Sequence, residues 1–97
     1  MMFLHLGKDF VVPIKDIIAI IDAETALKSQ DTKDFFEIAN EEGFIYNIVN
    51  EGIKSYIITE KVEKDKIYGS SIRKSIIYTS NISSTTLSKR AEFNKNI

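Results

Sequence analysis

The sequence predicts an α+β fold with a small mixed or antiparallel β-sheet, one packed α-helix and a short C-terminal helix. Short β-branched runs separated by turn residues recur along the chain, which is typical of strands. One segment in the first half repeats apolar residues at helical spacing. The 97 residues, of which 43% are hydrophobic, suffice for one core, so we expect a single domain over residues 1–97.

The longest β-branched run, residues 9–22, is predicted to be the buried centre of the fold, because nearly continuous apolar strands are usually covered on both faces. Pro13 interrupts this run. Since proline lacks an amide hydrogen, we expect two strands, Phe10–Val12 and Ile17–Ile21, joined at a bend or an edge position.

Turn residues indicate two β-hairpins in the first two thirds of the chain. The strand Met2–Leu6 is followed by Gly7–Asp9, a polar turn that leads into the run described above. Further along, Asn50–Gly52 separates Phe44–Val49 from Ile53–Glu60, and we expect these two segments to pair with each other.

A helix is predicted between the cap-forming residues at 29–32 and Gly43. Asp31 or Thr32 is expected to accept from the free amides at its start, and Gly43 to end it. The apolar face of this helix consists of Phe35, Phe36, Ile38 and Ala39. We expect this face to lie on the sheet.

The last third begins with Lys61–Lys66, which alternates in charge and has few apolar residues. The following segment, Ile67–Ser75, is expected to form a second small hairpin or a mobile excursion. Ile76–Thr79 is the last predicted strand. Ser83–Arg90 starts with hydroxyl residues and ends with cations, which favours a short helix. The hydroxyls at 83–86 either cap this helix themselves, the commoner arrangement, or donate to phosphates.

Basic charge gathers in the second half of the chain. Residues 1–50 hold four lysines and nine acids, whereas residues 51–97 hold nine basic residues and five acids. Such an imbalance permits an anionic partner, although most imbalances of this size are solvated surface. The candidates for phosphate contact in this half are Lys54, Lys61, Lys64, Lys66, Arg73, Lys74, Lys89 and Arg90.

Catalytic and metal-binding motifs are missing from the sequence. There is no cysteine, His5 is the single histidine, and no phosphate-binding loop, zinc-protease motif or nucleophile elbow occurs. We therefore expect no enzyme, no catalytic residue, no metal, no cofactor and no small-molecule substrate. The longest run of consecutive apolar residues, Ile17–Ile21, is far too short to cross a bilayer, so we expect no membrane contact and a cytoplasmic protein.

Several segments resemble one known family, in the same order along nearly the whole chain. They are Phe3–Gly7, Val11-Val12, Ile17–Asp22, Lys54–Thr59 and Ile82–Phe93, of which the last contains the distinctive Ser-Ser-Thr-Thr-Leu-x-Lys-Arg motif. These segments resemble the RemA/RemB extracellular matrix regulators of Gram-positive bacteria, and the RemB branch more closely.

The resemblance implies a small α+β protein that forms a ring-like homo-oligomer and binds DNA through repeated basic loops, as a transcriptional regulator of biofilm-matrix genes. The RemA branch, which looks similar to a LytTR-type DNA-binding domain, uses arginines where this chain has Asp16 and Glu51-Gly52. Lys15, Lys54 and the pair Lys89-Arg90 are then the replacement cations that the resemblance suggests.

Residues 61–75 also look like an insertion relative to the family. Their cations either replace the missing arginines, or the segment extends the strands as a hairpin. The alternative to DNA binding is a structural or protein-interaction module of the same fold.

Overall fold

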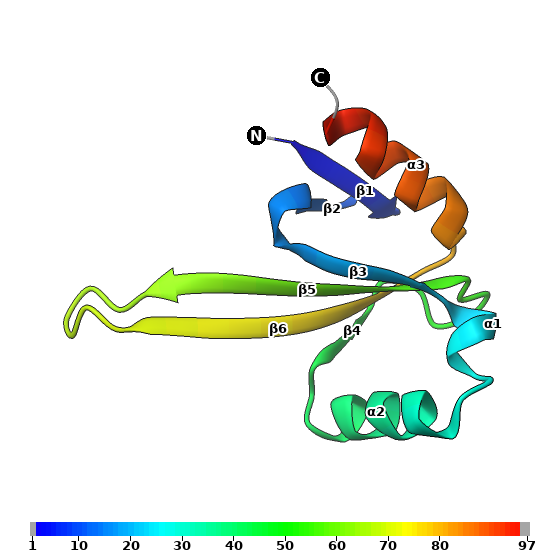
Figure 1. The fold of residues 1–97 in the computed structure, drawn as a ribbon, viewed down its shortest axis with the longest axis horizontal. Coiled ribbons are helices and arrows are strands. Elements are labelled where there is room, and N and C mark those ends of the chain that lie inside the picture. The colour runs from blue at the N-terminus through cyan, green and yellow to red at the C-terminus, as the bar shows by residue number, and fades with distance from the viewer. Residues whose placement is uncertain (1, 96–97) are drawn as a thin grey trace.

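The computed structural model describes the backbone of residues 2–95 and the side chains of residues 2–92, and it has the predicted α+β composition. Its elements form three layers, of which the middle one is a β-sheet (Figure 1). In chain order they are β1 (Phe3–Gly7), β2 (Phe10–Pro13), the 3-10 turn η1 (Ile14–Asp16), β3 (Ile17–Asp22), α1 (Ala23–Ala26), α2 (Gln30–Glu41), β4 (Ile45–Asn47), β5 (Ser55–Lys64), β6 (Ser71–Ser80) and α3 (Ser84–Lys95).

The central sheet has the strand order β3-β5-β6-β4. β5 pairs antiparallel with both β3 and β6, and the β5–β6 register runs from Ser55 opposite Ser80 to Lys64 opposite Ser71. β4 pairs parallel with β6, so the hairpin predicted between 44–49 and 53–60 is wrong. The physical reason is that Ile48 and Val49 turn into the core instead of continuing a strand, and β5 begins on the far side of β6.

The main core lies between the sheet and a second layer made of the antiparallel β1–β2 hairpin and α3 (Figure 1). Its buried members are Leu4, Leu6, Val12, Ile14, Ile48, Val49, Ile57 and Leu87. The predicted β1–β2 hairpin is therefore confirmed, and its apolar face closes one side of the sheet.

Residues 9–22 are not the buried centre that their composition suggested. The two predicted strands are present as β2 and β3, but β3 is an edge strand with a neighbour only on the β5 side. Its residues are half-buried, and Ile18 is 59% exposed. The centre is instead β5, where Ile57 is fully buried against the β1 leucines, because an inner strand has neighbours on both sides.

Buried hydroxyl groups join the layers at the end of the β5–β6 pairing that lies away from its turn. The Ser80 hydroxyl donates to the Leu6 carbonyl and accepts from the Ile82 amide at 3.0 Å. The Ser55 hydroxyl donates to the Ile82 carbonyl at 2.8 Å, and Thr79 donates to the Val49 carbonyl at 2.8 Å. Each of these hydroxyls therefore satisfies a backbone group of another segment, and the bonds to Leu6 and Ile82 attach the second layer to the sheet.

Both predicted helices begin close to the predicted positions, and α2 also ends where expected, whereas α3 runs on to Lys95, beyond the predicted end at Arg90. The α2 cap is Ser29, which accepts from the Thr32 amide at 3.4 Å, instead of Asp31 or Thr32. Gly43 follows the helix at a φ of 78°, as expected of a residue that ends a helix. At α3 the Ser83 hydroxyl accepts from the Thr86 amide at 3.2 Å, so this hydroxyl caps its own helix. The one-turn helix α1, capped by Asp22, was not expected.

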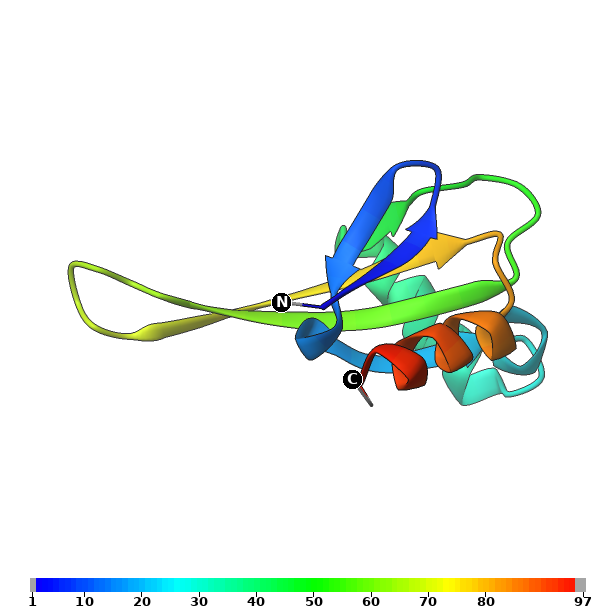
Figure 2. The ribbon, with the colours of Figure 1, turned by 90° about the horizontal axis from the view of Figure 1, so that it is seen from above.

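Residues 61–75 form the distal part of the β5–β6 hairpin, here called the arm, and Figures 1 and 2 show it projecting beyond every other element. Asp65 shapes its turn by accepting from the Ile67 amide at 2.8 Å and the Tyr68 amide at 3.3 Å. Gly69 supplies the positive φ of 68° that the turn requires. The arm is thus an ordered extension of two strands, and its origin as an insertion stays a prediction.

Replacing Ser80 with alanine is expected to lower the free energy of unfolding by about 1–3 kcal/mol, because the Leu6 carbonyl and the Ile82 amide lose a buried partner. Urea unfolding followed by circular dichroism measures the change. Ser71→Ala, at the exposed end of the same strand, is the matched control and should stay within about 0.5 kcal/mol of wild type. Equal stability of the two variants would show that the buried hydroxyl contributes nothing.

Candidate nucleic-acid interface

Three candidate cations converge where the arm leaves the body of the protein. Lys15 comes from η1, Lys61 from β5 and Lys74 from β6, and we call these three residues the arm-base cluster. Lys61 and Lys74 are directly opposite each other in the strand register. A cleft of about 350 Å³ lies here, lined by Pro13, Lys15, Asp16, Glu60, Lys61 and Val62. A hollow of about 180 Å³ shares Asp16 and Lys61 with this cleft and reaches Lys74.

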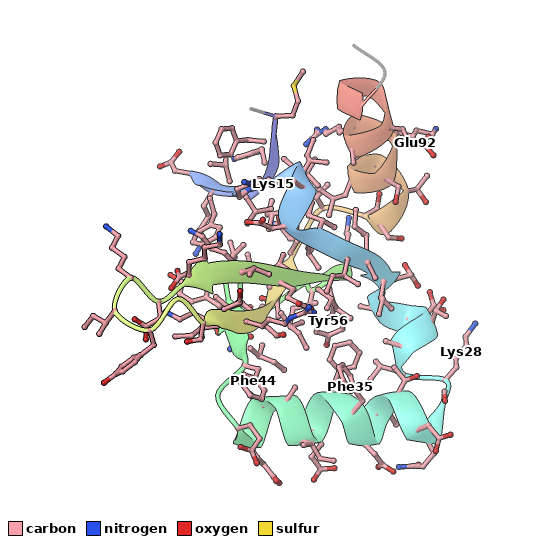
Figure 3. All side chains as sticks on the ribbon, turned by 60° about the vertical axis from the view of Figure 1, so that its left-hand side comes forward. Lys15, Lys28, Phe35, Phe44, Tyr56 and Glu92 are labelled. Atoms are coloured by element: carbon pink, nitrogen blue, oxygen red, sulfur yellow. The ribbon has the colours of Figure 1, made fainter. Side chains whose placement is uncertain are left out.

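The local sequence explains why Lys15 is exposed at this place. Pro13 ends β2, and the following 3-10 turn buries Ile14 in the core. The next side chain, Lys15, consequently faces solvent, and Figure 3 shows it at the turn, on the side of the sheet opposite α2. The bend between the two strands, predicted from the proline, thus positions one cation of the cluster.

Acidic side chains accompany these cations. Arg73 forms an ion pair with Glu60 at 2.9 Å, and Lys74 forms one with Glu63 at 3.4 Å. Asp16 lines both hollows. No other ion pair occurs among the side chains of residues 2–92, so Lys15 and Lys61 form no ion pair with another described side chain. Exposed pairs of this kind contribute about 0–1 kcal/mol.

The other predicted cations do not join the cluster. Lys64 and Lys66 lie at the far end of the arm, whereas Lys54 precedes β5 at its opposite end, about 30 Å from Lys64 along a strand rise of about 3.3 Å per residue. Lys89 and Arg90 are exposed on α3. Within one chain the candidate cations are therefore spread over at least four separate places.

An aromatic cluster behind the cations was missed by sequence reasoning. The Tyr78 ring centroid lies 5.0 Å from that of Phe10 and 5.8 Å from that of Tyr46, and Tyr78 lines the hollow with Lys61 and Lys74. Burial, followed by the proximity of Tyr46 and of the Asp16 carboxylate, raises the pKa of Tyr78 above its ordinary value of 10.0. The sequence of residues 76–79 predicts an ordinary core strand. No local sequence pattern indicates that the rings of Phe10 and Tyr46 pack against Tyr78 in this strand.

The structure also bears on three other roles: catalysis by His5, metal binding and membrane spanning. The His5 ring nitrogen Nε2 is hydrogen-bonded to the Lys8 carbonyl in the β1–β2 turn, and its side chain is exposed. In the part of the chain that the structure describes, no three histidine or acidic side chains lie close enough together to hold a metal ion. The described helices include none that is long and apolar enough to span a membrane.

Comparison with known proteins identifies the family. The family model described as extracellular matrix regulatory protein A-like, or RemA-like, matches residues 3–91. The chain belongs to the RemA-like family. This RemA-like chain is also 33% identical over 92 residues to Extracellular matrix regulatory protein B of Bacillus subtilis (strain 168), a match covering 95% of this chain and 93% of that protein. The resemblance drawn from the sequence segments is confirmed.

The raised pKa of Tyr78 makes a prediction for alkaline stability in this RemA-like protein. The folded protein holds the phenol proton more tightly than the unfolded chain, so this contribution is fully present below pH 10.0 and is lost as the pH rises through the folded-state pKa. We expect the urea midpoint of wild type to fall more steeply above pH 10.0 than that of Tyr78→Phe.

Tyr68→Phe, at the exposed end of the arm, is the matched control and should follow the wild-type profile. Identical pH profiles for wild type and Tyr78→Phe would contradict the assigned environment of Tyr78.

Proposed function

We propose that this chain is a cytoplasmic, DNA-binding transcriptional regulator of extracellular-matrix genes, without catalytic activity, which acts as a ring-like homo-oligomer. Membership of the RemA-like family supports the regulatory role. The observation that carries the DNA-binding part is the arm-base cluster, where Lys15 and Lys61 line one cleft and Lys61 and Lys74 line the adjoining hollow.

The proposed chemistry is contact with the phosphate backbone. Lysine side chains act as flexible point charges toward phosphates and carry no base specificity by themselves. Each copy offers few such contacts, and Asp16 and Glu63 reduce the local positive charge. Binding by one copy is therefore weak and sensitive to salt, whereas several copies presenting the same face to one duplex gain affinity through effective concentration.

The second candidate is a structural or protein-interaction module of the same fold that binds no DNA. The two ion pairs of the arm and the net charge of −1 favour it, since both lower the positive potential available to DNA. The two candidates agree on self-association. They differ in whether the assembled protein binds a duplex.

An electrophoretic mobility shift with promoter DNA, measured across ionic strengths, tests the proposal. The double variant Lys15→Gln/Lys61→Gln is expected to bind more weakly on every DNA sequence, with the slope of log K against log salt reduced by about two per bound copy. Lys28→Gln/Lys33→Gln removes the same charge near the start of α2, away from the cluster, and should retain the wild-type slope.

Two outcomes would count against the DNA-binding proposal. If wild type shows no salt-sensitive shift at low ionic strength, the interaction-module candidate replaces it. If both double variants lose the same affinity, the arm-base cluster is not the DNA contact.

A further inference from the structure

An apolar groove lies between α2 and the sheet, on the face opposite the main core. It has a volume of about 310 Å³ and is lined chiefly by Phe35, Ile38, Ala39, Phe44, Ile58 and Ile77. Ala39 is the only fully buried residue of α2, and it does not belong to the main core. Figure 3 shows Phe35 and Phe44 in the space between helix and sheet. The predicted packing of this helix is thus loose, and apolar surface remains open.

The end of the arm carries a protruding apolar surface, in contrast to the hollow apolar surface beside α2. Ile67 and Tyr68 are each 82% exposed, more than any other large hydrophobic residue of the described chain. The Asp65 carboxylate, accepting from both their amides, holds the turn that presents them. A turn of this kind usually carries polar residues, whereas here two large apolar side chains stand on a backbone that the Asp65 carboxylate holds in place.

The charges around the two surfaces are complementary. Residues 30–44, which form the outer wall of the groove, carry five acids and one lysine. The arm, residues 61–75, carries five basic residues and two acids. The acids are Asp31, Asp34, Glu37, Glu41 and Glu42, and the basic residues are Lys61, Lys64, Lys66, Arg73 and Lys74. A basic arm with an apolar end therefore fits an acidic helix beside an apolar groove, and this match also steers the encounter.

We propose that Ile67 and Tyr68 of one copy dock in the α2 groove of a second copy of this chain. The arm cannot fill its own groove, because Ile58 and Ile77 belong to the base of the same two strands. About eight residues of extended strand, on the order of 25 Å, separate Ile58 from the end of the arm. Figures 1 and 2 show the arm pointing away from α2.

Such a contact is heterologous, since one copy gives its arm and the next gives its groove. Repetition of a heterologous contact produces a ring when the rotation closes and a filament when it does not. The inference rests on the self-association in the proposed function and assigns the two surfaces that make it. Lys15, on the other side of the sheet, stays accessible to DNA in this arrangement.

Disulfide trapping tests the contact directly, because the natural sequence contains no cysteine. Tyr68→Cys protein is mixed with Ile38→Cys protein carrying a mass label, without DNA, and oxidised gently. We expect the mixed disulfide dimer to form several-fold faster than in a mixture of Tyr68→Cys with Leu27→Cys. Leu27 is the matched control, because it is 59% exposed against 58% for Ile38 and does not line the groove.

Equal rates for the two mixtures would overturn the docking inference. Circular dichroism verifies that each variant folds, and Phe44→Cys, 48% exposed on the groove, serves as a second position. As a complement, Ile67→Ser/Tyr68→Ser is expected to sediment as a smaller species than wild type at equal concentration, whereas Ser70→Ala should not. An arm variant that sediments like wild type also overturns the inference.

The same samples separate this inference from the proposed function. If wild type assembles and shifts DNA but the cysteine pair fails to cross-link, the docking contact is wrong and the proposed function stands. If the pair cross-links and DNA is not shifted, the docking contact stands and DNA binding is wrong. A wild type that is monomeric at all concentrations overturns the docking contact and the proposed oligomer together.

Discussion

The pairing of β5 with β6 is the interaction on which the rest of the structure depends. Ten residue pairs join these strands, from Ser55–Ser80 to Lys64–Ser71, and β3 and β4 add to their outer edges. One face of β5 and β6 lies against the main core. The Ser80 hydroxyl donates to the Leu6 carbonyl and the Thr79 hydroxyl donates to the Val49 carbonyl, so both attach other segments to β6. Loss of this pairing would remove both the layer interfaces and the arm.

The two faces of the sheet are covered unequally, and the candidate functional surfaces follow from this. The β1–β2 hairpin and α3 close one face tightly, whereas α2 leaves an apolar groove on the other. The strands also run beyond both covering layers, which creates the arm and the cationic cleft at its base. An antiparallel pair whose end lacks a packed apolar face is marginal as a folded unit, and the contact with a second copy that we propose would cover the end of the arm.

Local signals in the sequence were sufficient for much of the fold. Proline at 13 located the bend, glycine at 43 located the end of a helix, and the hydroxyls from 83 located the start of another. Strand partners were not predictable, because β4 pairs with β6 across more than thirty residues and short apolar runs do not encode their neighbours. For the same reason β3 was mistaken for the centre of the fold.

The candidate site was predictable as a set of residues but not as a location. The distribution of charge along the chain predicted the basic residues of the arm, and the family resemblance added Lys15. These residues come together only because of the long β5–β6 pairing. The acids that pair with Arg73 and Lys74 also come from across this pairing. Electrostatic neighbours in a sheet are set by register, which the sequence pattern alone did not reveal.

The most direct test of the account is the mass of the protein particle bound to a promoter duplex at low ionic strength, measured by sedimentation with separately labelled protein and DNA. We expect several copies on one duplex, assembled with the same number of copies as in free protein. A single copy bound to each duplex, or an assembled protein that sediments apart from the DNA, would contradict it.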